Sequence, residues 1–69
     1  MTIRARNRFK GKVVDLVKAV TAAHVRIDLG GGAIVTASIT NEAVDELGLK
    51  VGGDAHAVIK ASDVMVAID

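Results

Sequence analysis

The sequence opens with a run in which every second residue is a cation. These cations are Arg4, Arg6, Arg8, Lys10 and Lys12. Because side chains alternate between the two faces of an extended strand, this spacing predicts a strand that carries all five charges on one face. A helix would scatter the same charges around its circumference. Two interpretations stay open: the charges protect a sheet edge from aggregation, or they form a surface that binds an anion.

The overall composition predicts a small cytoplasmic domain that assembles with copies of itself. The 69 residues include no cysteine and only two histidines, which stand alone, so we expect neither disulfides nor a directly coordinated metal. We also expect no secretion leader and no membrane span. Hydrophobic residues make up 51% of the chain, yet Phe9 is the only aromatic. So short a chain buries little surface alone, and it has no disulfide to stabilise it. The surplus of apolar residues therefore predicts a homo-oligomer.

The charge of the chain is unevenly distributed along its length. Residues 1–14 carry five cations and no acid, whereas the remainder carries four cations and eight acids, for a net charge of +1. The positive charge is therefore local, which favours a binding site over a diffuse basic surface.

Hydrophobic alternation and turn residues predict five strands and one helix. The expected strands cover residues 3–18, 23–29, 33–40, 55–60 and 64–68, and the helix follows Thr40 or Asn41 as its N-cap and ends at Gly48. The long first strand must bend or bulge, and Gly11 is the expected place. We predict a mainly β, single domain over residues 1–69, a five-stranded Greek-key barrel of the oligonucleotide/oligosaccharide-binding (OB) type with one short helix.

The three consecutive glycines of residues 30–32 join two predicted strands. A short glycine link in this position indicates a hairpin turn. A phosphate-binding loop would instead require a helix after the glycines. No grouping of residues typical of catalysis is present, and the two histidines, His24 and His56, are interpreted as ordinary surface or interface residues. We therefore predict that the chain is not an enzyme.

Groups able to hold an anion recur at a few places in the chain. Arg4 and Arg6 lie in the first predicted strand, Lys60 ends the fourth, and Thr40 stands at the start of the helix, where backbone N–H groups are free. Cationic side chains add charge-assisted hydrogen bonds. A small oxyanion would be enclosed if the fold brought these elements together.

These residues carry a resemblance to a known family. The run from Ile3 to Val13 resembles the opening motif of the molbindins, the small Mop-type molybdate-binding proteins (TOBE/Mop domain), which reads roughly S-A-R-N-x-x-x-G-x-V. The similarity continues through the glycines of residues 30–32, Thr40 and the E-L-G of residues 46–48. It ends with residues 58–65, V-I-K-A-S-D-V-M, and so covers essentially the whole chain.

The resemblance implies an OB-like fold with strands exchanged between subunits, assembled as a hexamer of three dimers. It implies non-catalytic binding of molybdate or tungstate at subunit interfaces, for intracellular molybdenum storage, buffering or homeostasis. The residues matching Arg6 and Lys60 contact the oxyanion from one subunit, with the backbone N–H of the residue matching Ala5. Thr40 and the position of Ala43 approach from the neighbouring subunit. On this view Arg8, Lys10 and Lys12 are solvated strand charge.

Two positions depart from the family pattern. Position 4 is usually Ser in the family and is Arg4 here, and position 43 is often Ser and is Ala43 here. Two hydroxyl donors are therefore missing, and Arg4 either replaces a hydroxyl with charge or points to solvent. Selectivity over sulfate is expected to depend on pocket size, since both anions are dianions.

Two other functions are compatible with an OB-type domain. Single-stranded nucleic-acid binding fits the cationic first strand, but such proteins stack bases on aromatic side chains, and one phenylalanine and a net charge of +1 argue against a nucleic-acid partner. A purely structural assembly module is the third interpretation.

Overall fold

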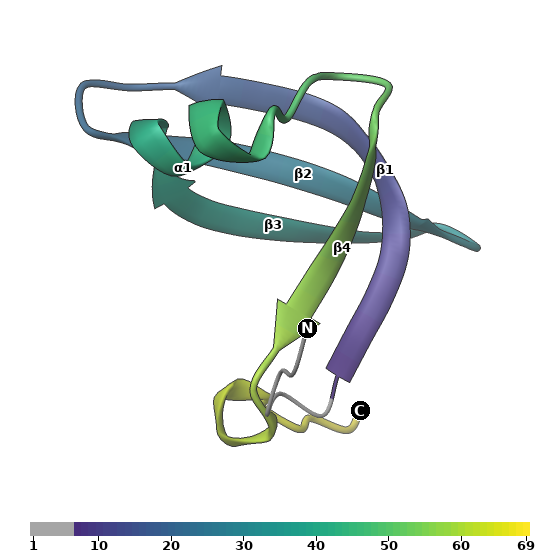
Figure 1. Cartoon of the computed structure of the whole chain (residues 1–69). Helices are drawn as coiled ribbons and strands as arrows, with labels where there is room; N and C mark the ends of the chain where they lie inside the picture. Colours follow the sequence, from purple (N-terminus) through teal and green to yellow (C-terminus); the bar gives the residue numbers. More distant parts are fainter. Residues whose placement is uncertain (1–6) are drawn as a thin grey trace.

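The computed structural model describes residues 7–69 and shows a curled antiparallel sheet with one short helix. Its elements are β1 (Asn7–Lys18), β2 (Ala22–Gly30), β3 (Ala33–Thr40), α1 (Asn41–Leu47), β4 (Asp54–Ile59) and the 3₁₀ turn η1 (Ala61–Asp63). The strands pair in the order β3-β2-β1-β4. Figure 1 shows that β1 bends along its length and carries β4 away from the plane of β2 and β3. The predicted mainly β class with one short helix is confirmed.

Strand β1 changes its partner part-way along its length. Residues 7–12 pair with β4, whereas residues 12–18 pair with β2. The change occurs beside Gly11, where an added Cβ would overlap the Asp28 carbonyl oxygen and lie 2.8 Å from Cγ2 of Ile27. The sequence predicted a bend or bulge at Gly11; the register shift with β2 lies instead between Val13 and Asp15. Gly11 therefore serves close approach between two strands.

The two ends of α1 are formed by the residues that the sequence predicted. The Thr40 hydroxyl accepts a hydrogen bond from the Ala43 backbone N–H at 3.0 Å, which makes Thr40 the N-cap. Gly48 ends the helix in the left-handed conformation, at φ +65°. The predicted hairpin is also present, with positive φ at both Gly31 and Gly32, as a tight two-residue turn requires.

The core of the single chain is small. Among residues 7–69 it consists of six buried side chains: Val13, Ala23, Val25, Ile27, Val44 and Ala57. The two largest side chains that are fully buried are both valines, Val13 and Val25. In α1, Val44 is buried, while Leu47 is largely exposed. The fold thus leaves much of its apolar surface open to solvent.

The predicted fifth strand at residues 64–68 is wrong for the single chain. After η1, these residues form no regular structure, and Met65, Val66 and Ile68 are each at least 90% exposed. A strand needs a neighbouring strand to pair its backbone groups, and this segment leaves β4 without reaching a free edge of the sheet (Figure 1). The described chain is a four-stranded open sheet and not a closed five-stranded barrel.

Candidate functional site

The six predicted site residues are distributed over three parts of the chain. Arg4, Ala5 and Arg6 lie outside the described residues. Thr40 and Ala43 lie at the start of α1, and Lys60 directly follows β4. The structure therefore places three of the six.

Thr40 and Ala43 form one local unit around the helix cap. Thr40 ends β3 in an extended conformation, with φ −70° and ψ 153°, and its side chain is exposed. Because its hydroxyl oxygen accepts from the Ala43 N–H, the hydroxyl hydrogen is left to donate to another group. The Ala43 N–H is committed to the cap. Of these two residues, Thr40 is therefore the one with a hydrogen-bond donor free for a ligand.

Lys60 lies at the other end of the molecule, beside the start of β1. The residue is exposed, and its carbonyl accepts from the Asp63 N–H at 2.9 Å, which forms η1. The neighbouring Ile59 carbonyl accepts from Nδ2 of Asn7 at 3.1 Å. Asn7 directly follows Arg6 in the sequence. The described structure therefore ties the beginning of β1 to the strand end that carries Lys60.

One chain does not bring these two groups of residues together. Helix α1 packs on β2 and β3, whereas Lys60 precedes η1 at the far end of β4, on the opposite side of the molecule (Figure 1). A ligand that contacts both Thr40 and Lys60 would have to lie between two copies of the chain.

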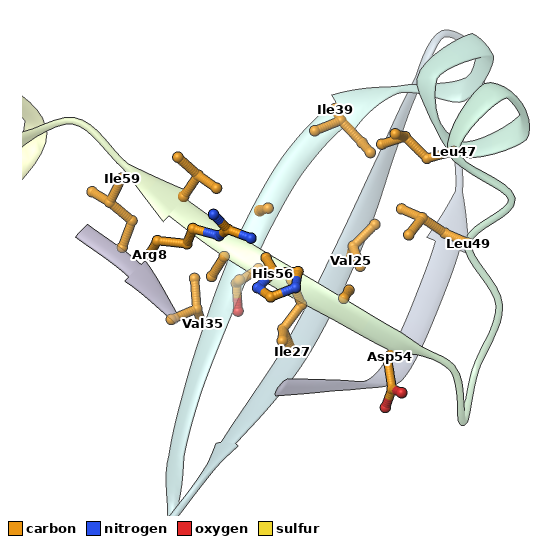
Figure 2. A pocket seen from close by; sticks show the side chains of 15 residues that line it. Arg8, Val25, Ile27, Val35, Ile39, Leu47, Leu49, Asp54, His56 and Ile59 are labelled. Carbon is orange, nitrogen blue, oxygen red and sulfur yellow. The ribbon is translucent and has the colours of Figure 1, made fainter. Parts of the chain in front are cut away.

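A large apolar groove separates β4 from β2 and β3. It has a volume of about 840 Å³, and Figure 2 shows Ile39, Leu47 and Leu49 at one end, with Val25 and Ile27 farther along. Its lining also includes the polar side chains of Arg8, Asp54 and His56. None of the three described site residues, Thr40, Ala43 and Lys60, lines this groove. Sequence reasoning missed it, although the surplus of Val, Ile and Leu was a signal that some apolar surface would need a cover.

Two cations of β1 lie across the β1–β4 ladder from polar residues of β4. Lys12 and Lys10 lie directly opposite Asp54 and His56. The Lys12 Nζ is 2.8 Å from Oδ1 of Asp54. This hydrogen bond and the Lys12 charge, with smaller contributions from Lys10 and His56, hold the pKa of Asp54 below its ordinary value. Lys12 is thus engaged in an exposed ion pair, in agreement with its interpretation as solvated strand charge.

Residues 7–69 contain neither a candidate metal-binding cluster nor a candidate membrane-spanning helix. No group of three or more His, Asp or Glu side chains is placed to hold a metal ion in this part of the chain. No helix within it has the length and hydropathy needed to cross a membrane. The oxygen and nitrogen donors described above are suited to an anion.

Comparison with known proteins decides the family. The model of the TOBE domain matches residues 3–66. The chain belongs to the TOBE domain family. The probable molybdenum-pterin-binding protein of Haemophilus influenzae is 46% identical over 69 residues, covering all of both chains. The Mop-type resemblance predicted from the sequence is therefore confirmed.

Solved structures of Mop-type proteins share the fold of this TOBE domain. MopII from Clostridium pasteurianum superposes with a TM-score of 0.90 at 45% identity, covering 97% of this chain and 100% of MopII. The cytoplasmic molybdate-binding protein ModG, solved with molybdate bound, gives a TM-score of 0.90 at 45% identity. That match covers 94% of this chain and 46% of ModG.

Proposed function

We propose that this TOBE domain binds molybdate, without catalysing a reaction, at interfaces between its own copies. The observation that carries the proposal is the similarity to ModG, whose structure holds molybdate, at 45% identity over 94% of this chain. We further propose tungstate as a second ligand, since it is also a tetrahedral dianion, and a cytoplasmic role in molybdenum storage, buffering or homeostasis. The nucleic-acid alternative has no support from the relatives.

The chemistry of a tetrahedral dianion explains why two copies are needed. Four oxygens accept hydrogen bonds on all sides, and nearby cations must offset the loss of hydration. In the proposed site one copy supplies Arg6, Lys60 and the Ala5 N–H, with Arg4 near them. The other copy supplies the Thr40 hydroxyl and the surface around Ala43. The separation of Thr40 from Lys60 within one chain supports this division (Figure 1).

We also propose that the copies exchange strands and assemble as a hexamer of three dimers. The groove between β3 and β4 is lined by apolar side chains, and both strands are edges of the described sheet. The segment 64–68 of a second copy suits this groove, since all five of its residues are apolar and it pairs with no strand within residues 7–69. A strand placed there would complete the five-stranded barrel.

Calorimetric titration with sodium molybdate tests the binding proposal. Arg6→Ala is expected to abolish binding, because it removes a charge that faces the dianion. Lys12→Ala is the matched control, since it removes a cation of the same strand that pairs with Asp54 instead, and it should bind as the wild type does. Native mass spectrometry of the wild type would count subunits and ions together. Binding lost in Lys12→Ala and kept in Arg6→Ala would contradict the assignment.

A further inference from the structure

Asn41, the first residue of α1, fastens the helix to the loop between β1 and β2. Its side-chain Nδ2 donates to the carbonyls of Ala19 at 2.9 Å and Val20 at 3.3 Å. Its backbone N–H donates to the Thr21 carbonyl at 3.2 Å. One residue therefore bonds to all three residues of this loop, which lies beside α1 in Figure 1.

The other contacts of α1 constrain its direction less. Val44 is the one helix residue that is buried, and its packing is non-directional. The ion pair between Lys18 Nζ and Asp45 Oδ1 is short, at 2.7 Å, but the two side chains are 44% and 69% exposed. Such exposed pairs contribute little. A helix of seven residues is also too short to be stable alone. The orientation of its first turn therefore depends on Asn41.

We propose that Asn41 is a positioning residue for the half of the oxyanion site that Thr40 and Ala43 supply, an inference that rests on the proposed function. Thr40 is joined to Asn41 by one peptide bond, so a tilt at the start of α1 moves the Thr40 hydroxyl directly. Hydrogen bonds lose strength when distance and angle leave a narrow range. Asn41 thus holds the hydroxyl where the second copy presents the ligand.

The hydrogen bonds donated by Nδ2 fix the orientation of the Asn41 side-chain amide. Its Oδ1 is buried and has no hydrogen-bond partner within residues 7–69. Asn41→Asp keeps the shape of the side chain but replaces the donor with an oxygen that faces two carbonyls. Asn41→Ala removes the side chain altogether. Both variants should release the first turn of α1 from the loop.

Calorimetric titration with sodium molybdate tests this role in the full chain. Asn41→Ala and Asn41→Asp are expected to bind about tenfold more weakly than the wild type, the effect of weakening one hydrogen bond to a charged group. Asp28→Ala is the matched control. In the hairpin between β2 and β3, the Gly30 N–H donates to Oδ1 of Asp28 at 2.8 Å. Asp28→Ala removes this hydrogen bond and should lower thermal stability without changing the affinity for molybdate.

A double-mutant cycle with Thr40→Ala distinguishes positioning from general destabilisation. If Asn41 acts through Thr40, the affinity losses of Asn41→Ala and Thr40→Ala are less than additive in the double variant. Unchanged affinity in folded Asn41→Ala, or fully additive losses, would overturn the role of Asn41 while the proposed function stands. Absence of molybdate binding by the wild type would overturn the proposed function and this role with it.

Discussion

At Gly11 the backbone of β1 passes so close to β2 that a single methyl group has no room. Its nearest neighbours would be the Asp28 carbonyl oxygen and the Ile27 side chain, and a backbone oxygen cannot move aside alone. Gly11→Ala should lower the free energy of unfolding by about 1–3 kcal/mol, the usual cost of overpacking. Urea unfolding measures this, with the exposed Ser38→Ala as control. Equal stability of the two variants would mean that the strands separate freely at this point.

The ion pair across β1 and β4 predicts a measurable pKa change. The Lys12 hydrogen bond and charge lower the pKa of Asp54 from 3.8, so the pair stabilises the fold above the pKa of the unfolded state and this contribution disappears as pH falls through the lowered value. In Lys12→Ala the pKa of Asp54 should rise toward 3.8, as NMR titration of the carboxyl would show. Lys18→Ala, which breaks the ion pair with Asp45 instead, should leave the pKa of Asp54 unchanged. An unmoved pKa in Lys12→Ala would contradict the assigned cause.

Single residues show where prediction from the sequence ends. The alternation of Arg8, Lys10 and Lys12 was sufficient to predict a cationic strand face, because alternation is a local property. It could not show that Lys12 pairs with Asp54, which is 42 residues away. That contact depends on the register between β1 and β4. The register is known only from the folded structure.

Among the elements, those with local signals were predicted well. Strands β2 and β3 have alternating side chains and a glycine turn between them, and α1 has Thr40 and Gly48 at its ends. The bulge of β1 lies after Val13 and not at Gly11. A glycine in a strand indicates either a bulge or close packing against a neighbouring strand, and the sequence does not distinguish the two. Residues 64–68 have the apolar composition of a strand but pair with no strand in the described part of the chain, so composition alone did not predict their structure.

The C-cap of α1 provides a prediction about an element. Gly48 adopts φ +65°, and its N–H donates to the Asp45 carbonyl at 3.1 Å. Gly48→Ala should reduce the free energy of unfolding by about 1 kcal/mol, because a Cβ disfavours this conformation. Thermal unfolding of Gly48→Ala and of Glu46→Ala, an exposed helix position, would be compared. If Glu46→Ala lowered the free energy of unfolding as much as Gly48→Ala, the effect would come from helix propensity and not from the C-cap.

For the molecule as a whole, two incomplete features point to association. The described part of one chain buries six small or medium side chains in its core, and the apolar groove beside β4 is open. The Thr40 and Lys60 halves of the proposed site also lie apart. The composition predicted a need for partners, and the family resemblance predicted a shared site. Neither the groove nor the separation could be obtained from the sequence, since both depend on how β1 bends.

The proposed strand exchange predicts that stability depends on protein concentration. If residues 64–68 of one copy fill the groove of another, the unfolding temperature should rise with concentration, because association stabilises the folded state by mass action. In a strand, Val64, Val66 and Ile68 share one face and Met65 and Ala67 the other. Val66→Asp should therefore abolish the oligomer and the concentration dependence, since it buries a charge in the apolar groove. Ala67→Asp, one residue on, should preserve both. Analytical ultracentrifugation at micromolar concentration compares the variants, and a stable wild-type monomer would refute the exchange.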